Sequence, residues 1–262
     1  MFNSILTNEE LAALRLRELY QAHGYRFYRM RRFEEYDFYA GKKDFLSSGH
    51  ILTFTDLNGK LMALRPDVTL SIIKNVTQGK YYYDEKVYRV PKNSDTFREI
   101  PQVGIEHIGD LGGNDLREVL ELAVLSLKTL ACGRNFVLDV ADAGMVKSLM
   151  PEFHRAEILA CLSAKNIHGL RELHAPDELI ALAEKPAVKI ETAQSLITLY
   201  PEIHVDFSAV SNLNYYNGIV FKGYIEGLHE AVLSGGQYDM GIGGGGAGLA
   251  VYLDSIGGLK ND

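Results

Sequence analysis

Residues 205–238 constrain the fold of this chain more than any other stretch. They read VDFSAVSNLNYYNGIVFKGYIEGLHEAVLSGGQY, in which apolar and polar residues alternate over two runs separated by glycine-containing breaks. This alternation is typical of antiparallel strands with one buried face, and we expect a turn at Asn217-Gly218 within the first run. Neighbouring side chains in a strand point to opposite faces. We therefore expect only one of the adjacent Tyr215 and Tyr216 to face any given pocket.

Length and charge limit the classes of function. A chain of 262 residues can hold one large or two modest domains and bury a real core. Its formal charge of -7 argues against general electrostatic binding of nucleic acid, because phosphate binding depends on clustered lysine and arginine. One basic cluster exists, and acidic residues follow it at once, so we interpret it as a solvated strand edge. It consists of Arg26, Arg29, Arg31 and Arg32.

Neither a membrane anchor nor a metal site is expected. No run of about 18 apolar residues occurs, and the N-terminal MFNSILTNEE is not a signal peptide, so we predict a cytoplasmic protein. Cys132 and Cys161 lack the spacing of metal ligands or of a CxxC motif, which predicts buried, reduced thiols. Residues 241–246 satisfy GxGxxG but do not join the first strand and helix of a βαβ unit. We therefore expect no cofactor and no metal.

Local patterns predict an α+β protein. A capping box from Thr7 to Glu10 opens a helix that stops before Gly24, and the turn at residues 56–59 lies between two apolar runs, which predicts a hairpin. We expect a mostly antiparallel sheet with helices on one side, in a single domain spanning residues 1–262. The other expected elements are strands at 25–30, 80–90, 97–108 and 135–140, helices at 115–132 and from Asp67 through Leu70, Ile73 and Val76, and a small helical insertion at about 144–200.

Asp67 and Thr69 follow Pro66 at the start of one of these helices. Proline fits just ahead of a first helical turn, and both side chains can serve the free N–H groups of that turn. From the residues alone, capping is therefore the favoured role for both.

Several motifs occur in the order of the class II aminoacyl-tRNA synthetase core. FEEYDFY resembles the first motif, which forms the dimer interface in that family, and LRPDVTL resembles its LRPE-x-T signature. VYRVPKNSDTFREIPQVGIEHIG resembles the second motif, a strand–loop–strand unit, and GGQYD with GLAVYLDSI resembles the third, a strand running into a helix. With YYNG at the expected place, nearly the full length resembles histidyl-tRNA synthetases and their non-synthetase paralogues. The resemblance implies an antiparallel sheet flanked by helices.

The resemblance also implies a histidine pocket. Glu106 matches the acid that meets the imidazole, and a carboxylate with tyrosine hydroxyls can satisfy both ring nitrogens. Asp67 and Thr69 match the residues that hold the amino group, although synthetases usually carry the longer glutamate at the first position. The alternative for Glu106, a pair with a lysine on a sheet face, is less favoured once its neighbours are counted. The expected histidine-binding residues are Asp67, Thr69, Arg89, Gln102, Glu106, Tyr215 and Tyr216.

Three departures from the synthetase pattern argue against catalysis. Ser211, Gln237 and Ser255 stand where the family has arginines, including those that serve activation and clamp ATP phosphates. Phosphoryl chemistry depends on fixed cations, and serine offers neither the charge nor the bidentate fork of arginine. We therefore expect no catalytic residues. Because the chain ends at Asp262, we also expect no anticodon-binding domain.

Among the paralogues, this pattern resembles the regulatory subunit of ATP phosphoribosyltransferase. That family implies a partner, the short-form catalytic subunit at the first step of histidine biosynthesis, with histidine as the effector of feedback inhibition. It also implies a homodimer within a hetero-oligomer, without membrane or tRNA. The alternative is an enzyme that adenylates histidine or a related amino acid without charging tRNA, which Arg89 and Arg98 keep open as matches to second-motif arginines. A truncated synthetase is a weaker variant, because truncation would not replace the other arginines.

Overall fold

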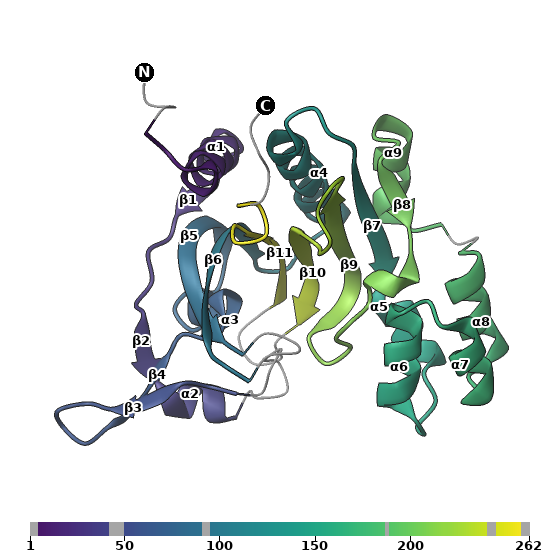
Figure 1. Ribbon diagram of the computed structural model, residues 1–262, viewed down its shortest axis with the longest axis horizontal. Helices are drawn as coiled ribbons and strands as arrows, with labels where there is room; N and C mark the ends of the chain where they lie inside the picture. Colours follow the sequence, from purple (N-terminus) through teal and green to yellow (C-terminus); the bar gives the residue numbers. More distant parts are fainter. Residues whose placement is uncertain (1–4, 42–49, 91–94, 187–188, 240–244, 258–262) are drawn as a thin grey trace.

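A sheet of eight strands forms the centre of the protein (Figure 1). The computed structural model describes residues 5–41, 50–90, 95–186, 189–239 and 245–257. The strands of this sheet are β1 (Arg26–Phe27), β5 (Gly79–Arg89), β6 (Arg98–Ile108), β7 (Phe136–Asp142), β8 (Ile203–Val205), β9 (Tyr216–Ile225), β10 (Leu233–Asp239) and β11 (Gly245–Tyr252). Their order is β1-β5-β6-β11-β10-β9-β7-β8. Only the edge strands β1 and β8 pair in parallel within this sheet, so the predicted mostly antiparallel α+β fold is confirmed.

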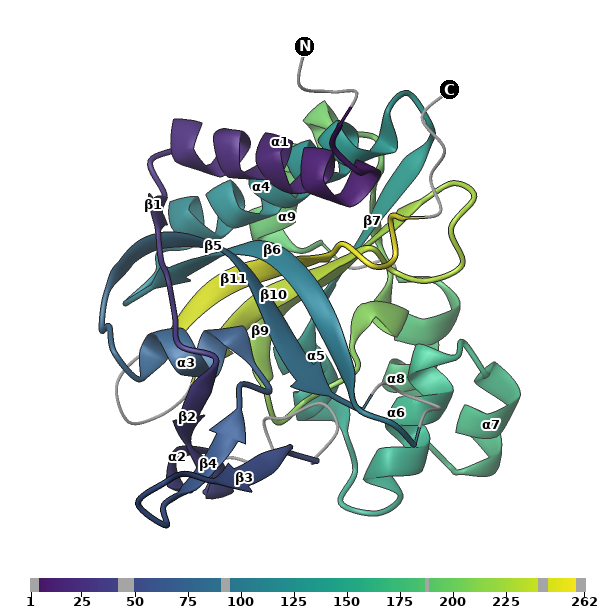
Figure 2. The same cartoon turned by 60° about the vertical axis from the view of Figure 1, so that its left-hand side comes forward.

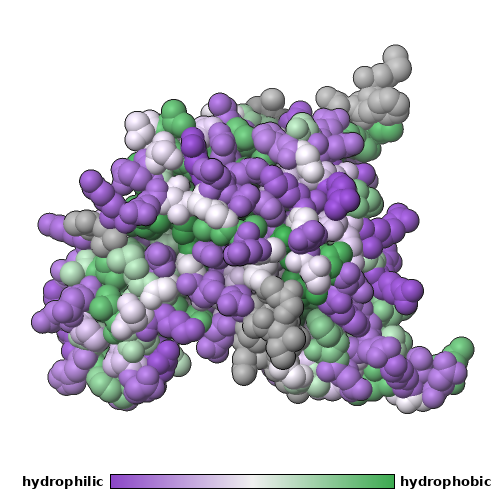
Figure 3. Space-filling view, turned by 180° about the vertical axis from the view of Figure 1, so that it is seen from behind, coloured by the Kyte–Doolittle hydropathy of each residue, from purple (hydrophilic) through white to green (hydrophobic). Residues whose placement is uncertain are grey.

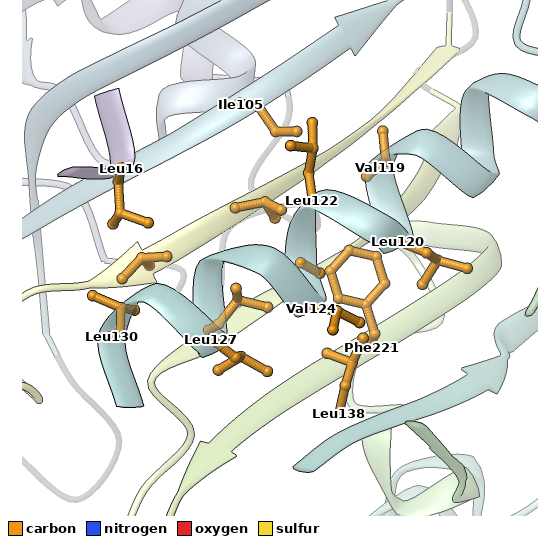
Figure 4. Packing of buried hydrophobic residues seen from close by; sticks show 14 of the residues in the cluster. Leu16, Ile105, Val119, Leu120, Leu122, Val124, Leu127, Leu130, Leu138 and Phe221 are labelled. Carbon is orange, nitrogen blue, oxygen red and sulfur yellow. The ribbon is translucent and has the colours of Figure 1, made fainter. Parts of the chain in front are cut away.

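One face of the sheet is covered by helices α1 (Asn8–Ala22), α4 (Gly113–Ala131) and α9 (Glu191–Leu199) (Figure 2). The predicted capping box at Thr7 is present and opens α1. Leu120 and Leu127 of α4 pack with Ile105 and Phe221 of the sheet in the main core (Figure 4). Burying each such side chain contributes roughly 1.5–3 kcal/mol. This core holds the strands rigidly against the helices. The cavity described below lies on the opposite face of the sheet.

Helices also lie against the second face, so the expectation of helices on one side was wrong. Helix α3 (Val68–Ile73) packs on Tyr83 of β5, on the face turned away from α4. Val220 of β9 joins a separate cluster, whereas its neighbour Phe221 joins the main core, because alternate residues of a strand point to opposite faces. The helices of that cluster are α5 (Ala143–Leu149), α6 (Arg155–Ser163), α7 (Ile167–Glu172) and α8 (Asp177–Glu184).

The predicted insertion at about 144–200 divides into two parts by its packing. Helices α5 to α8 share their own cluster with the short 3-10 helix η2 (Phe207–Ala209). In α9, Ala193 and Leu196 instead belong to the main core beside α4. The single-domain organisation with an insertion stays a prediction.

A second, three-stranded sheet lies beside the main one. It has the order β2 (Phe33–Glu35), β4 (Leu61–Leu64), β3 (Thr53–Thr55), and helix α2 (Tyr36–Ala40) follows β2. The predicted hairpin joins β3 to β4, where Asp56 Oδ1 accepts hydrogen bonds from the N–H groups of Asn58 and Lys60. Gly59 takes φ +78°, which favours glycine in this turn. The hairpin projects from the body at the lower left of Figure 1 and the lower right of Figure 3.

Four local predictions were wrong. Asn217 and Gly218 lie inside β9, which pairs with both β7 and β10, so the sheet overrides the local turn preference. Helix α3 ends at Ile73 rather than continuing to Val76. Residues 253–257 form a bend and a turn after β11 instead of a helix. Cys132 is exposed, because it caps the C-terminus of α4 in the left-handed conformation.

The surface gives no sign of a membrane segment among the residues that the structure describes. None of their helices is both long and apolar enough to span a bilayer. Seen from behind, hydrophilic side chains cover much of the surface and the apolar ones are interspersed (Figure 3).

Candidate functional site

A cavity of about 180 Å³ lies on the sheet face turned away from α4. Strands β5, β6, β10 and β11, helix α3 and the turn before β9 line it. Drug-sized ligands occupy roughly 300–1,000 Å³, so this smaller space suits a single amino acid. The structure brings all seven residues of the predicted histidine pocket to its wall, and their role as histidine ligands stays a prediction. They are Asp67, Thr69, Arg89, Gln102, Glu106, Tyr215 and Tyr216.

Strand β6 delivers Glu106 to the floor of this cavity. Its residues alternate, so that Val103 and Ile105 enter the main core while Gln102 and Glu106 face the cavity. The Glu106 side chain is only 2% exposed. Thr69 Oγ1 donates a hydrogen bond to its Oε1 over 2.5 Å, and Tyr238 Oη donates one to its Oε2 over 2.7 Å. Two short donors thus fix the carboxyl group in place.

Burial changes the protonation of Glu106. Removal from water raises the pKa of this carboxyl group to about 8, the two hydrogen bonds lower it, and the nearby Asp67 adds a further rise. At neutral pH the ligand-free pocket therefore favours the protonated acid. A ligand that brings a positive charge or a strong donor would favour the carboxylate, so this group is suited to recognising an imidazole.

Gln102 lines the same cavity from another position on β6 and has an unsatisfied donor. It is 3% exposed, and its Nε2 has no hydrogen-bond partner among the residues that the structure describes. A buried polar atom without a partner costs free energy, on the order of 1–3 kcal/mol. A bound polar ligand in the cavity would supply an acceptor for this amide.

Asp67 and Thr69 enter the cavity from the N-terminus of α3. Asp67 is the N-cap, and its Oδ1 accepts a hydrogen bond from Leu70 N over 2.9 Å, so the predicted capping role is confirmed for this residue. Burial raises the pKa of Asp67, and Arg89 and two backbone N–H groups offset part of that rise. The hydroxyl of Thr69 serves Glu106 instead. Capping and cavity lining are therefore compatible in Asp67.

Tyr215 and Tyr216 both line the same cavity, so the prediction that only one of them faces a given pocket was wrong. Tyr215 precedes β9, in a turn where Asn212 Oδ1 accepts hydrogen bonds from the N–H groups of Asn214 and Tyr215. Strand alternation therefore does not apply to it. The two rings meet edge to face with centroids 4.7 Å apart. Burial raises the pKa of both hydroxyl groups, which stay protonated donors.

Sequence reasoning missed two functional positions, Tyr238 and Gly248. The segment GGQYD contains the tyrosine, but only the fold places its hydroxyl on Glu106. Gly248 of β11 is the register partner of Glu106. A Cβ added there would lie 2.3 Å from Glu106 Oε2, so only glycine leaves room for the carboxyl group.

Replacing Gly248 by alanine is therefore expected to weaken histidine binding by about tenfold or more, which corresponds to about 1.4 kcal/mol. The added methyl group displaces the Glu106 carboxyl group from Thr69 and Tyr238. Isothermal titration calorimetry with histidine measures the change. Gly113→Ala is the matched control, because an added Cβ there meets nothing within 4 Å. Equal affinities for the two variants would contradict the proposed position of the ligand.

A larger cavity of about 620 Å³ adjoins the first and shares residues with it. Ser211 lines both cavities, and Ser255 lines the larger one. Gln237 lines neither of them, and its amide oxygen lies against Gly218. The shared residues are Arg89, Ser211, Tyr216, Ser234, Gly235 and Tyr252.

The larger cavity has a mixed electrostatic character. Arg89 and Arg98 are register partners on β5 and β6 and both line it. Lys222 adds a third cation, and Glu230 and Asp254 add two acids. Within the part of the chain that the structure covers, no group of three His, Cys, Asp or Glu side chains is arranged to hold a metal ion.

Comparison with known proteins places the chain in a family. A profile of the histidyl-tRNA synthetase family matches residues 6–200 and 182–256. An ATP phosphoribosyltransferase regulatory subunit from Lactococcus lactis subsp. cremoris is 28% identical over 95% of this chain and 91% of its own length. The predicted resemblance to such regulatory subunits is thereby confirmed.

Solved structures share the fold. A crystal structure of an ATP phosphoribosyltransferase regulatory subunit/histidyl-tRNA synthetase from Bacillus halodurans has a TM-score of 0.77 at 22% identity, covering 97% of this chain and 79% of that one. A chain of the ATP phosphoribosyl transferase (HisG:HisZ) complex from Thermotoga maritima has a TM-score of 0.74 at 17% identity, covering 94% and 97%. The predicted class II synthetase-like fold is confirmed. The chain belongs to the histidyl-tRNA synthetase family.

Proposed function

We propose that this protein is a regulatory subunit of ATP phosphoribosyltransferase that binds histidine and conveys both activation and feedback inhibition in the cytoplasm. The observation that carries the proposal is that the buried Glu106 and the unpartnered amide of Gln102 both line one amino-acid-sized cavity. The named function of the Lactococcus lactis relative supports the regulatory role.

The cavity offers groups for each part of a histidine molecule. Glu106 and the tyrosine hydroxyls suit the imidazole nitrogens. The carboxylate of Asp67 suits the ammonium group, and the guanidinium of Arg89 suits the carboxylate. An apolar amino acid of similar size would leave Gln102 unpaired and bring no donor to Glu106, so the pocket favours histidine over it.

We infer that the subunit has no chemistry of its own. The positions that carry arginines in synthetases hold Ser211, Gln237 and Ser255. Without those cations, charge that develops on ATP phosphates lacks fixed partners. The expected partner is the short-form catalytic subunit, and the similarity to a chain of the HisG:HisZ complex from Thermotoga maritima supports a partner of this kind.

We propose that two copies pair through the region of the first motif, within a hetero-oligomer. This region contains β2 and α2, and Phe33 on β2 is 55% exposed. A dimer interface there would remove this ring from water.

The proposed function is tested with the catalytic subunit from the same source. Product formation is followed with and without this protein, and histidine is then titrated. Activation that histidine reverses is the expected result. No activation together with no complex would refute the proposal.

A second candidate is an enzyme that adenylates histidine or a related amino acid without charging tRNA. Arg89 and Arg98, side by side on the wall of the larger cavity, favour it. We expect no histidine-dependent exchange of pyrophosphate into ATP, because the remaining arginines are replaced. Exchange above the background without histidine would support the enzyme instead.

A further inference from the structure

Helix α3 connects the amino-acid cavity to the second sheet through polar side chains at alternate positions. Thr69 donates to Glu106 in the cavity floor. Two residues later, Ser71 is fully buried, and its Oγ donates to Asp67 O over 3.0 Å and lies 3.0 Å from Tyr39 Oη. The first turns of α3 are therefore hydrogen-bonded to the main sheet on one side and to α2 on the other.

The buried pair of Tyr39 and Glu34 continues this connection into the second sheet. Tyr39 is fully buried, and its hydroxyl group donates a short hydrogen bond to the carboxyl group of Glu34 on β2. Burial and the nearby Glu34 raise the pKa of Tyr39, so it remains a neutral donor. Glu34 is the register partner of Ala63 on β4. Hydrogen bonds thus join α3 through Tyr39 to β2, which pairs with the central strand β4 of the second sheet.

Apolar packing forms a second connection between the same two places. Tyr238, the donor to Glu106, belongs to one cluster with Leu70 of α3, Tyr39 of α2 and Ala63 of β4. Tyr215 of the cavity wall packs against this cluster and lies 5.7 Å from Tyr238 between ring centroids. Close-packed clusters transmit displacement because their members have few alternative positions.

We propose that histidine occupancy is conveyed to the second sheet by helix α3 through Ser71, Tyr39 and Glu34. This inference rests on the proposed function and specifies its regulation. A ligand that engages Glu106 shares its carboxyl oxygens with Thr69 and Tyr238, which alters the hydrogen bond that anchors α3. The second sheet projects from the body (Figure 2), and its exposed Phe33 and Leu61 would let the second copy, proposed above to pair there, respond to its position.

Tyr39→Phe is expected to uncouple binding from regulation. In the complex with the catalytic subunit, the concentration of histidine for half inhibition should rise by about tenfold or more, within the usual range of allosteric coupling. The dissociation constant of histidine for the free variant should change by less than about threefold, because Tyr39 does not line the cavity. Hydrogen exchange of residues 53–64 should respond to histidine in the wild type and not in the variant.

Tyr200→Phe is the matched control, because it removes a tyrosine–glutamate hydrogen bond, to Glu121, between α9 and α4. Ser71→Ala tests the same connection if Tyr39→Phe fails to fold. Inhibition as in the wild type, with the same exchange response, would overturn the inference, and so would loss of histidine binding in both Tyr39→Phe and Ser71→Ala. Failure of the wild type itself to bind histidine refutes the proposed function, which is a separate result.

Discussion

Replacing Glu106 by alanine is expected to abolish histidine binding, with a loss of affinity of at least about 100-fold. The variant removes the carboxyl group that accepts hydrogen bonds from both Thr69 and Tyr238 in the cavity. Truncating one partner of a buried, hydrogen-bonded charged pair typically costs about 2–5 kcal/mol. Isothermal titration calorimetry with histidine measures the loss.

The fold of Glu106→Ala should remain intact, because burial already disfavours the charged form of this carboxyl group in the ligand-free protein. Circular dichroism and thermal unfolding check this point. Glu99→Ala is the control on the same strand, since Glu99 pairs with Lys86 at the surface and lines neither cavity. If histidine bound Glu106→Ala with the same affinity as the wild type, Glu106 would not be part of the histidine site.

Sequence reasoning succeeds where local chemistry determines the structure. The capping box at Thr7 needs only residues within one helical turn, and the hairpin at residues 56–59 needs only its own loop. The alternation in β6 similarly sends Gln102 and Glu106 to one face and Val103 and Ile105 to the other. These short-range patterns were enough to bring the predicted pocket residues together once the family order of the strands was assumed.

The remaining features depend on contacts between distant segments. Tyr215 stands in a turn that Asn212 forms with local hydrogen bonds, but the cavity beside that turn is built by strands from distant parts of the chain. The hydroxyl of Tyr238 meets Glu106 across the sheet, between residues far apart in the sequence. Asn217-Gly218 favours a turn locally, yet pairing of β9 on both sides keeps this segment extended. No single-segment pattern contains this information.

The stability of the ligand-free protein should depend on pH through Glu106. The folded protein raises the pKa of this group from 4.5 to about 8, so the fold favours the protonated acid. Its contribution is fully present below pH 4.5 and is lost as the pH rises towards 8. Glu106→Gln removes this loss. Relative to the variant, the wild type should lose on the order of 3 kcal/mol of unfolding free energy between pH 5 and pH 8. Urea unfolding at both pH values measures the difference.

The comparison with Glu106→Gln isolates this group from Asp67, whose pKa burial also raises, because both proteins retain Asp67. Parallel pH profiles of the two proteins would contradict the assignment of a raised pKa to Glu106. Saturating histidine should reduce the pH-dependent difference, because an imidazole bound at the carboxyl group stabilises the charged form that burial penalises. The same buried acid that weakens the empty pocket at pH 8 thus gives histidine its largest effect on stability there.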